Sequence, residues 1–181
     1  VCDKISLYIE TVKPKRFTYV AFDGVAPMAK ISQQRERRYK SKLEERMLSK
    51  KSFDTSVITP GTPFMKKLNL KIRDYFKFKK NVILDLCDNV GEGEHKLFHY
   101  IRNKKYNKER IMIYGMDADL IVLSINHLPR NIVLLREIPD YFNKYVCNWS
   151  KDAIYVMNIR EFNLNIEKTM ISMNLGEKKN Q

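Results

Sequence analysis

Short apolar runs alternate with longer helical patterns through most of this chain, and this alternation restricts the fold more than any other feature. The strand-like runs occupy residues 17–22, 82–87, 110–114 and 131–135. Helical patterns cover residues from about 5 to 12, 29 to 48, 64 to 78, 92 to 104 and 120 to 124. Strands that are separated by helices tend to pair in parallel, because a parallel pair needs a long crossover. We therefore predict an α/β fold with a mainly parallel central sheet flanked by helices.

The length of the chain fits a single domain. The chain has 181 residues, of which 44% are apolar, and its aromatic residues include 10 Tyr and 9 Phe. This composition is enough to bury a core, so disorder along the whole chain is not expected. We expect one domain over residues 1–175 and a polar, frayed tail over residues 176–181.

A large excess of basic residues indicates an anionic partner. Lys and Arg number 34 against 21 Asp and Glu, which gives a formal charge of +13. Nucleic acid ranks ahead of a membrane surface as that partner. No apolar run reaches the roughly 18 residues that a membrane helix needs, so we expect no membrane partner. The alternative is a basic protein whose charges only keep it in solution.

Cysteine usage favours a reducing compartment. The chain has three cysteines, an odd number, and they form no Cys-x-x-Cys pair. Neither a disulfide framework nor a zinc site is therefore indicated. We expect an intracellular protein, in the cytoplasm or the nucleus, and we expect it to be a monomer.

Acidic residues follow three of the predicted strands. They are Asp23, Glu92, Glu94, Asp117 and Asp119. The carboxyl ends of parallel strands lie at one edge of a sheet, where ligand sites form. Carboxylates that crowd together repel one another unless a cation neutralises them, and Mg²⁺ prefers oxygen ligands of this kind. The pattern predicts a magnesium site at this edge, with Mn²⁺ as a substitute, that could activate water against a phosphodiester.

Each of these acids alone has a more ordinary interpretation. Asp and Gly are common in turns between strands and helices, and acids interact favourably with helix N-termini. For any single acid the ordinary interpretation is favoured. The pairs Glu92-x-Glu94 and Asp117-x-Asp119 are harder to dismiss, because each pair follows a different strand.

One face of the helix predicted from residue 29 carries polar and basic side chains. Lys30, Gln34, Arg37 and Arg38 are spaced at i, i+4, i+7 and i+8 and therefore share a face. Arg and Lys bind phosphate oxygens, so a terminal-phosphate pocket beside the acids is one interpretation. A solvated helix face is the other, and spacing alone leaves the two equal.

Other basic and aromatic residues carry weaker signals. We interpret Lys104, Lys105, Lys108 and Arg110 as a solvated helix end, and His95 and His127 as residues without metal-ligand spacing. Tyr19, Phe22, Phe64 and Tyr114 occupy apolar periodic positions, so we expect them in the core rather than stacked on bases.

Four segments closely resemble the signatures of the Xrn family of 5′→3′ exoribonucleases. They are DGVAPMAKISQQRERR at residues 23–38, ITPGTPFM at 58–65, GEGEHK at 91–96 and IYGMDADLI at 113–121. They occur in the order found in the family, and the resemblance runs from about residue 13 to residue 137. Together the four segments are highly specific, whereas an Asp-x-Asp pair alone would be weak.

The resemblance implies a role for each candidate residue. Asp23, Glu92, Glu94, Asp117 and Asp119 match the metal-binding acids of the family. Lys30, Gln34, Arg37 and Arg38 match its pocket for a 5′-monophosphate. The implied fold is similar to that of flap endonucleases and other PIN-like nucleases. The implied reaction is the magnesium-dependent hydrolysis of 5′-monophosphorylated RNA to nucleoside monophosphates by a two-metal mechanism.

The chain also departs from the family pattern. An earlier strand that ends in an Asp-x-Asn-Gly turn, a later Asp, and the region that encloses the RNA path have no counterpart. We therefore interpret residues 1–175 as part of the N-terminal catalytic region, without its first strand and C-terminal part. Two alternatives stay open: a flap-type DNA nuclease, and an RNA-binding fragment without turnover. The second would show a steep salt dependence and no effect of magnesium.

Overall fold

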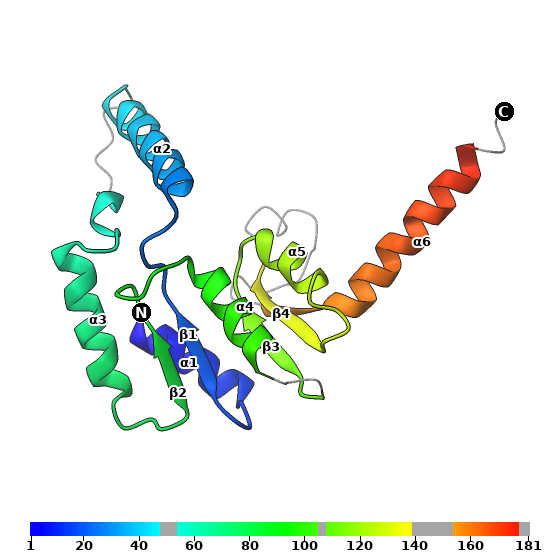
Figure 1. The fold of residues 1–181 in the computed structure, drawn as a ribbon, viewed down its shortest axis with the longest axis horizontal. Helices are drawn as coiled ribbons and strands as arrows, with labels where there is room; N and C mark the ends of the chain where they lie inside the picture. The colour runs from blue at the N-terminus through cyan, green and yellow to red at the C-terminus, as the bar shows by residue number, and fades with distance from the viewer. Residues whose placement is uncertain (48–53, 105–107, 139–153, 178–181) are drawn as a thin grey trace. The chain divides into compact units, whose positions relative to one another are not determined.

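The chain folds into two compact units, Val1–Tyr100 and Ile101–Gln181. The computed structural model describes residues 1–47, 54–104, 108–138 and 154–177. Each unit contains strands together with helices, so the predicted α/β class is confirmed (Figure 1). The interpretation of residues 1–175 as one domain stays a prediction.

The first unit is built on two parallel strands. Its elements are α1 (Cys2–Val12), β1 (Thr18–Ala21), α2 (Met28–Met47), the 3₁₀ helix η1 (Thr55–Val57), α3 (Pro63–Phe76), β2 (Val82–Asp85) and the first residues of α4 (Gly93–Asn103). Strands β1 and β2 pair with Thr18 opposite Val82 and Ala21 opposite Asp85. Their carboxyl ends therefore lie side by side, as the predicted site requires.

The core of the first unit lies between the strands and α3. Ile72, Phe76 and Leu86 form its buried centre, and Ile5 and Ile9 of α1 pack against it. The segment at residues 58–65 starts α3, because Thr62 accepts a hydrogen bond from the backbone N–H of Met65 and Pro63 occupies the first turn. Ser or Thr at the N-cap followed by Pro is a strong helix start.

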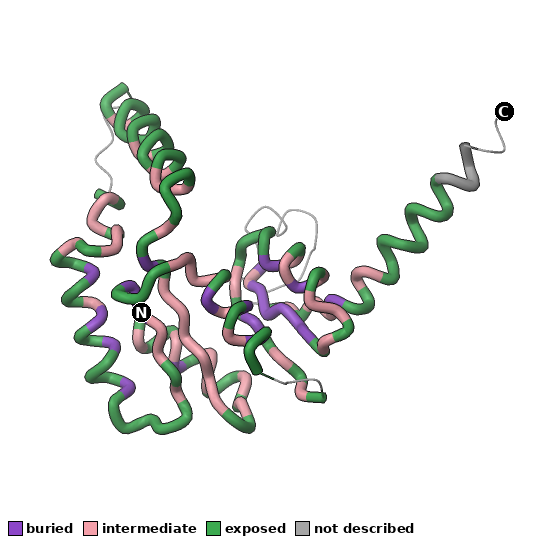
Figure 2. The backbone as a smooth tube through the Cα atoms, viewed as in Figure 1, coloured by how far each residue is buried: buried purple, intermediate pink, exposed green. Residues whose placement is uncertain are grey.

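The second unit is built on a three-stranded mixed sheet. Its elements after α4 are β3 (Ile111–Tyr114), α5 (Asp119–Ile125), β4 (Ile132–Glu137), β5 (Ile154–Asn158) and α6 (Ile159–Glu177). The strand order is β3-β4-β5, in which β3 and β4 are parallel and β4 and β5 are antiparallel. Strand β4 is almost entirely buried and forms the centre of this unit (Figure 2).

The predicted single central sheet is not confirmed. The described strands form two hydrogen-bonded sheets, one in each unit. Strand β5 and helix α6 were not anticipated from the sequence pattern. Asn158 marks their junction, since its side-chain oxygen accepts hydrogen bonds from the backbone N–H groups of Arg160 and Glu161. An Asn followed three residues later by Glu is a sequence signal that could have revealed this helix.

The four aromatic residues expected in the core differ from one another. Phe22 packs against the core of the first unit, and Tyr19 is partly buried. The expectation was wrong for Phe64 and Tyr114, which are 44% and 42% exposed. Phe64 lies in the first turn of α3, off the face formed by the buried residues of that helix, and the Tyr114 hydroxyl donates to Glu137.

Several smaller expectations concern the surface. Lys104, Lys108 and Arg110 are exposed, as expected for solvated residues, whereas Lys105 and Cys147 lie outside the described residues. His127 follows α5 in a turn. The first two residues of the expected tail end α6, and residues 178–181 lie outside the described part of the chain. None of the described helices is long and apolar enough to cross a membrane.

Candidate functional site

Two turns that follow β1 and β2 are joined by their backbones. The N–H of Gly24 donates to the carbonyl of Gly91 over 2.8 Å, and the N–H of Gly91 donates to the carbonyl of Val25 over 2.9 Å. A Cβ atom on Gly24 would lie 1.7 Å from the carbonyl oxygen of Asn89, so any side chain at this position would force the backbone of the turns to shift. The pairing brings residues that are about 70 positions apart in sequence to one place.

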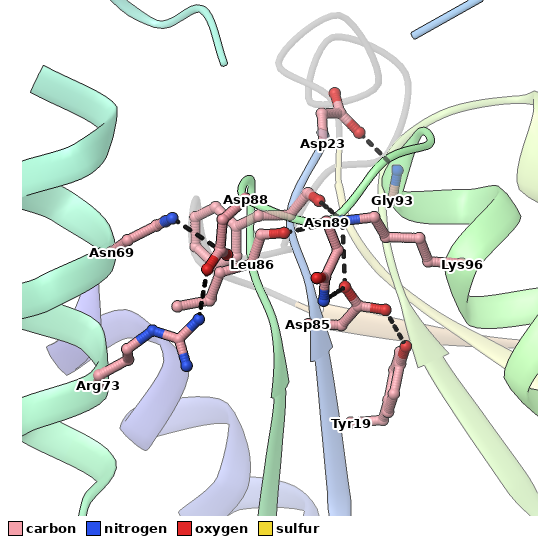
Figure 3. Close-up of polar contacts among 11 residues, drawn as sticks. Tyr19, Asp23, Asn69, Arg73, Asp85, Leu86, Asp88, Asn89, Gly93 and Lys96 are labelled. Atoms are coloured by element: carbon pink, nitrogen blue, oxygen red, sulfur yellow. Dashed lines mark hydrogen bonds and ion pairs between the residues drawn. The ribbon is translucent and has the colours of Figure 1, made fainter. Parts of the chain in front are cut away.

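Asp23 lies at the N-terminus of α4 as a result of this pairing. The backbone N–H of Gly93 donates to the Asp23 carboxylate over 2.6 Å (Figure 3). A Cβ on Gly93 would lie only 3.1 Å from that carboxylate oxygen, so glycine permits the close approach. The unpaired N–H groups of a helix N-terminus favour a negative charge there. Asp23 nevertheless remains exposed to solvent.

Glu92 and Glu94 flank Gly93, and the charges of Glu92 and Asp23 both act on Glu94. Partial burial, and then the charges of Glu92 and Asp23, raise the pKa of Glu94 above its ordinary value. Ionisation of Glu94 is thus opposed first by its burial and then by two neighbouring carboxylates. This is the condition under which a bound cation stabilises carboxylates that would otherwise take up protons.

Lys30 of α2 supplies one counter-charge to this cluster. Its ammonium group lies 3.1 Å from a carboxylate oxygen of Glu92, whose side chain is only 12% exposed. One residue from the predicted phosphate pocket thus contacts one of the predicted metal ligands directly. Any cation that coordinated Glu92 would compete with Lys30 for the same carboxylate.

The other predicted phosphate-binding residues differ in exposure. Gln34 and Arg38 are partly buried like Lys30, and they follow it at intervals of four residues along α2. Arg37 is exposed, and no residue in α2 is fully buried. The stripe Lys30–Gln34–Arg38 is thus the side of α2 that is least open to solvent. An evenly solvated helix would show no such stripe.

Asp117 and Asp119 lie in the second unit, in the turn between β3 and α5. Both side chains are exposed. The Asp117 carboxylate accepts a hydrogen bond from the backbone N–H of Asp119 over 3.1 Å, which closes a local turn at the start of α5. The structure therefore brings Asp23, Glu92, Glu94 and Lys30 together in one unit, and the two aspartates together in the other.

The donor set suits a hard divalent cation in its chemistry. All five acids offer oxygen ligands, as Mg²⁺ and Mn²⁺ prefer. Among the residues that the structure describes, no three acidic, His or Cys side chains are already close enough to hold an ion between them. In the first unit, Glu92 and Asp23 influence Glu94 through their charges. Glu92 is paired with Lys30, and Asp23 accepts a hydrogen bond from Gly93.

Sequence reasoning missed a polar network behind the first-unit acids. The Lys96 ammonium group donates to the carbonyls of Phe22 and Leu86 over 2.9 and 2.8 Å and lies 3.1 Å from the Asp85 carboxylate (Figure 3). Asp85 also accepts hydrogen bonds from Tyr19 and Asn89 over 2.5 and 2.9 Å.

The pKa values of Asp85 and Tyr19, the two acidic groups of this network, differ from their ordinary values. Burial works to raise the pKa of Asp85, but hydrogen bonds from Tyr19, Asn89 and Lys96 outweigh it and leave the pKa lowered. Burial first, and then the contact with Asp85, raise the pKa of Tyr19. Asp85 is therefore a carboxylate, and Tyr19 stays protonated, across the ordinary pH range. No pattern in the sequence marks Lys96 as buried.

A second cation, Arg136 in β4, lies behind the Asp117 turn. Its guanidinium donates to the carbonyls of Asp117 and Met116 over 3.1 and 2.5 Å. Arg136 is only 8% exposed, in a strand whose other buried residues are apolar. A charged residue within an otherwise apolar strand is the sequence signal that could have drawn attention to it.

Comparison with known proteins identifies relatives over most of the chain. The family model described as XRN 5′-3′ exonuclease N-terminus matches residues 1–138. A protein of Saccharomyces cerevisiae named 5′-3′ exoribonuclease 1 is 39% identical over 76% of this chain and 11% of its own length. The 5′-3′ exoribonuclease 2 of Emericella nidulans is 35% identical over 72% of this chain and 17% of its own length.

A third relative extends the comparison. The 5′-3′ exoribonuclease 1 of Schizosaccharomyces pombe is 39% identical over 71% of this chain and 12% of its own length. The chain thus spans between 11% and 17% of the length of these three curated relatives. Residues 1–138, which the family model matches, contain all the candidate acids and the stripe Lys30–Gln34–Arg38 on α2.

Proposed function

Because the chain belongs to the XRN 5′-3′ exonuclease N-terminus family, we propose that it forms part of the catalytic region of a 5′→3′ exoribonuclease. The observation that carries this proposal is the contact between Lys30 and Glu92 over 3.1 Å. It joins a residue that is suited to bind a terminal phosphate to one that is suited to bind a cation. A 5′→3′ exonuclease needs these two functions side by side.

The proposed metal ligands are the five acids Asp23, Glu92, Glu94, Asp117 and Asp119, and the proposed ions are Mg²⁺ or Mn²⁺. Bound ions of this kind activate water and stabilise the leaving oxygen of a phosphodiester. The raised pKa of Glu94 is consistent with this assignment, because burial first, and then the charges of Glu92 and Asp23, oppose the ionisation of a carboxyl group that a cation would stabilise.

The proposed substrate is RNA that carries a 5′-monophosphate. Lys30, Gln34 and Arg38 form a partly buried stripe in which two cations and an amide can donate to a terminal phosphate. Arg37, which is exposed, would add charge at the edge. A phosphate held on this stripe would place the first phosphodiester at a fixed distance from the acids. The product would then be one nucleoside monophosphate per cycle.

The proposal is tested by comparing RNA with 5′-monophosphate, 5′-hydroxyl and 5′-triphosphate ends, with Mg²⁺ and with EDTA. We expect only the monophosphate RNA to be degraded, and only with Mg²⁺. The variant Asp117→Ala/Asp119→Ala should lose this activity, whereas Asp74→Ala, which removes an exposed acid of α3, should keep it.

Two other outcomes would contradict the proposal. Cleavage of a DNA flap in preference to RNA would indicate a flap-type nuclease. RNA binding that weakens steeply with salt, together with no turnover in Mg²⁺, would indicate a nucleic-acid-binding segment. Because the chain covers only part of the length of its relatives, the assay is made with this chain and with a longer protein that contains it.

A further inference from the structure

Each unit contains a buried cationic side chain next to its acid-bearing turns, Lys96 in the first unit and Arg136 in the second. Lys96 is 8% exposed and Arg136 is 8% exposed. Buried Lys and Arg are rare unless they are paired, because the removal of a charge from water is costly. Both residues are paired here, and in both cases the partners include backbone carbonyls beside the candidate acids.

Lys96 joins three segments of the first unit. Its carbonyl acceptors belong to Phe22, the residue before Asp23, and to Leu86, the residue after β2. Its third acceptor is the Asp85 carboxylate at the end of β2. Lys96 itself lies in the first turn of α4, directly after Glu94 and His95, and its backbone N–H donates to the carbonyl of Glu92.

The three acceptors use the full donor capacity of the lysine. An ammonium group has three N–H donors and no acceptor. All three are directed at protein oxygens at distances between 2.8 and 3.1 Å. Lys96 therefore has no donor left for a phosphate group, although it lies near the acids. Lys96 can therefore affect the acids only through the two carbonyls and the Asp85 carboxylate that it contacts.

Arg136 makes comparable hydrogen bonds to backbone carbonyls in the second unit. Its two terminal nitrogens donate to consecutive carbonyls, those of Met116 and Asp117, on the inner side of the turn that presents Asp117 and Asp119. Its Nε atom is buried and has no hydrogen-bond partner among the described residues. The two remaining hydrogen bonds, to Asp117 and Met116, offset part of the desolvation cost of this atom.

We propose that Lys96 and Arg136 are positioning residues, which fix the backbone of the three acid-bearing turns so that their carboxylates can bind divalent cations. This inference rests on the proposed function, because it assumes that the acids bind metal. The described partners of both side chains are protein oxygens, and none of them is a carboxylate of the five proposed ligands. Residues that orient metal ligands in this way commonly contribute 10- to 100-fold to metal affinity.

The alternative is that each cation only contributes to folding stability. The first unit allows the two roles to be separated, because the partner of Lys96 can also be changed. Lys96→Met alone leaves the Asp85 carboxylate without its cation, so we expect it to unfold at lower temperature. Lys96→Met/Asp85→Asn removes both charges and should regain much of that thermal stability, since Asn can still accept from Tyr19.

The experiment measures Mn²⁺ binding to the full chain by electron paramagnetic resonance, with thermal unfolding of each variant alongside. We expect Lys96→Met/Asp85→Asn and Arg136→Met to bind Mn²⁺ about 10- to 100-fold more weakly than the unmodified chain while they remain folded. The matched controls are Lys71→Met on α3 and Arg160→Met on α6, which remove exposed cations and should leave the affinity unchanged.

The outcomes separate this inference from the proposed function. If the unmodified chain does not bind Mn²⁺, the assignment of the acids as metal ligands fails. If it binds Mn²⁺ and the folded variants bind it equally well, the acids are ligands but the positioning role is overturned. If a Met variant does not fold, Lys96→Gln keeps a donor with a shorter reach. Unchanged Mn²⁺ affinity in that variant also overturns the inference.

Discussion

The two acid-bearing regions of this chain are built in opposite ways. In the first unit, Asp23 meets Glu92 and Glu94 through hydrogen bonds between turns that are about 70 residues apart. In the second unit, Asp117 and Asp119 belong to one short turn that a hydrogen bond between them closes. The first arrangement depends on tertiary structure, whereas the second is largely set by local sequence.

This difference has electrostatic consequences. The first-unit acids crowd one another, and burial together with the charges of Glu92 and Asp23 raises the pKa of Glu94. The second-unit aspartates are exposed, and the described contacts at their turn are to backbone groups. A long-range assembly can thus hold charge under repulsion, because two chain segments are fixed against each other. The local turn of the second unit instead leaves both of its aspartates exposed to water.

The largest expected effect comes from Glu94→Gln. We expect it to lower RNA hydrolysis about 1000-fold, which corresponds to about 4 kcal/mol, as removal of one group that stabilises the transition state commonly does. The same variant should raise the thermal stability of the metal-free chain at neutral pH. It removes a carboxylate whose ionisation the fold disfavours. Single-turnover RNA degradation and thermal unfolding in EDTA measure the two effects.

The pH dependence gives a separate check on Glu94. A carboxyl group whose pKa is raised in the folded protein favours folding below its unfolded value, 4.5 here, and loses that contribution as the pH rises through the folded value. Metal-free wild-type protein should therefore lose stability over this interval relative to Glu94→Gln. Parallel stability curves for the two proteins would contradict the crowding of the acids.

The second-largest expected effect is the loss of stability when a glycine in each region is replaced by alanine. A Cβ on Gly24 would strike the backbone carbonyl of Asn89 at 1.7 Å, whereas one on Gly115 would meet the end of the Leu120 side chain at 2.2 Å. A side chain can rotate away, but the paired turns cannot separate without breaking their hydrogen bonds. We expect Gly24→Ala to cost about 3 kcal/mol and Gly115→Ala about 1 kcal/mol in urea unfolding.

The expected order of these two costs is the critical result. If Gly115→Ala proved the more destabilising substitution, the backbone pairing of the first-unit turns would not be the constraint that we infer. Gly61→Ala is a useful reference, because Gly61 has a φ of +90° but no atoms near its missing Cβ. It should report backbone strain alone, at about 1 kcal/mol.

A smaller effect is expected from Lys30→Met. Lys30 is 39% exposed in its side chain, so the loss of its ion pair with Glu92 should change stability by less than about 1 kcal/mol. The preference for 5′-monophosphate over 5′-hydroxyl RNA should fall about 10-fold, because a charged hydrogen bond to the phosphate is lost. The ratio of kcat/KM for the two RNAs measures this preference.

Lys40→Met on the same helix is the control for Lys30→Met, since Lys40 is exposed and lies off the stripe. Equal loss of preference in both variants would show that the overall charge of α2, rather than the Lys30 contact, selects the phosphate. An unchanged preference in both would remove Lys30 from the phosphate pocket.

The smallest effect concerns the second unit alone. Asn158→Ala removes the side chain that caps α6, and we expect a loss of about 1 kcal/mol in urea unfolding. Asn165→Ala in the exposed middle of α6 should be neutral or slightly stabilising, because Ala is the better helix former there. RNA degradation should be the same in both variants. Unequal activity would indicate that α6 takes part in the reaction.

The regular elements were predictable because apolar runs and helical periods are local properties. Strands β1 to β4 and helices α1 to α5 begin and end within a few residues of the predicted limits. Strand β5 was missed although Ile154–Met157 form a short apolar run, and none of its residues is fully buried. The exposure of Phe64 could not be foreseen, since it depends on the angle at which α3 meets the core.

The candidate acids were predictable because they follow strands, but their support was not. The burial of Lys96 results from the packing of α4 against the ends of β1 and β2, and a lysine on a helix is ordinarily solvated. The close approach at Gly24 likewise depends on the turn at Asn89, far away in sequence. Local patterns therefore indicate which groups can do the chemistry, whereas tertiary contacts decide how firmly they are held.

One measurement tests most directly whether the acids after β1, β2 and β3 bind divalent cations. Substoichiometric Mn²⁺ is added to isotopically labelled chain, and the paramagnetic broadening of amide signals is followed by nuclear magnetic resonance. We predict broadening at Asp23, at Glu92 and Glu94 and at Asp117 and Asp119, with one midpoint and with reversal by excess Mg²⁺. Broadening confined to one of the two units, or spread evenly over exposed acids such as Asp74, would contradict the assignment of these five residues to metal-dependent hydrolysis.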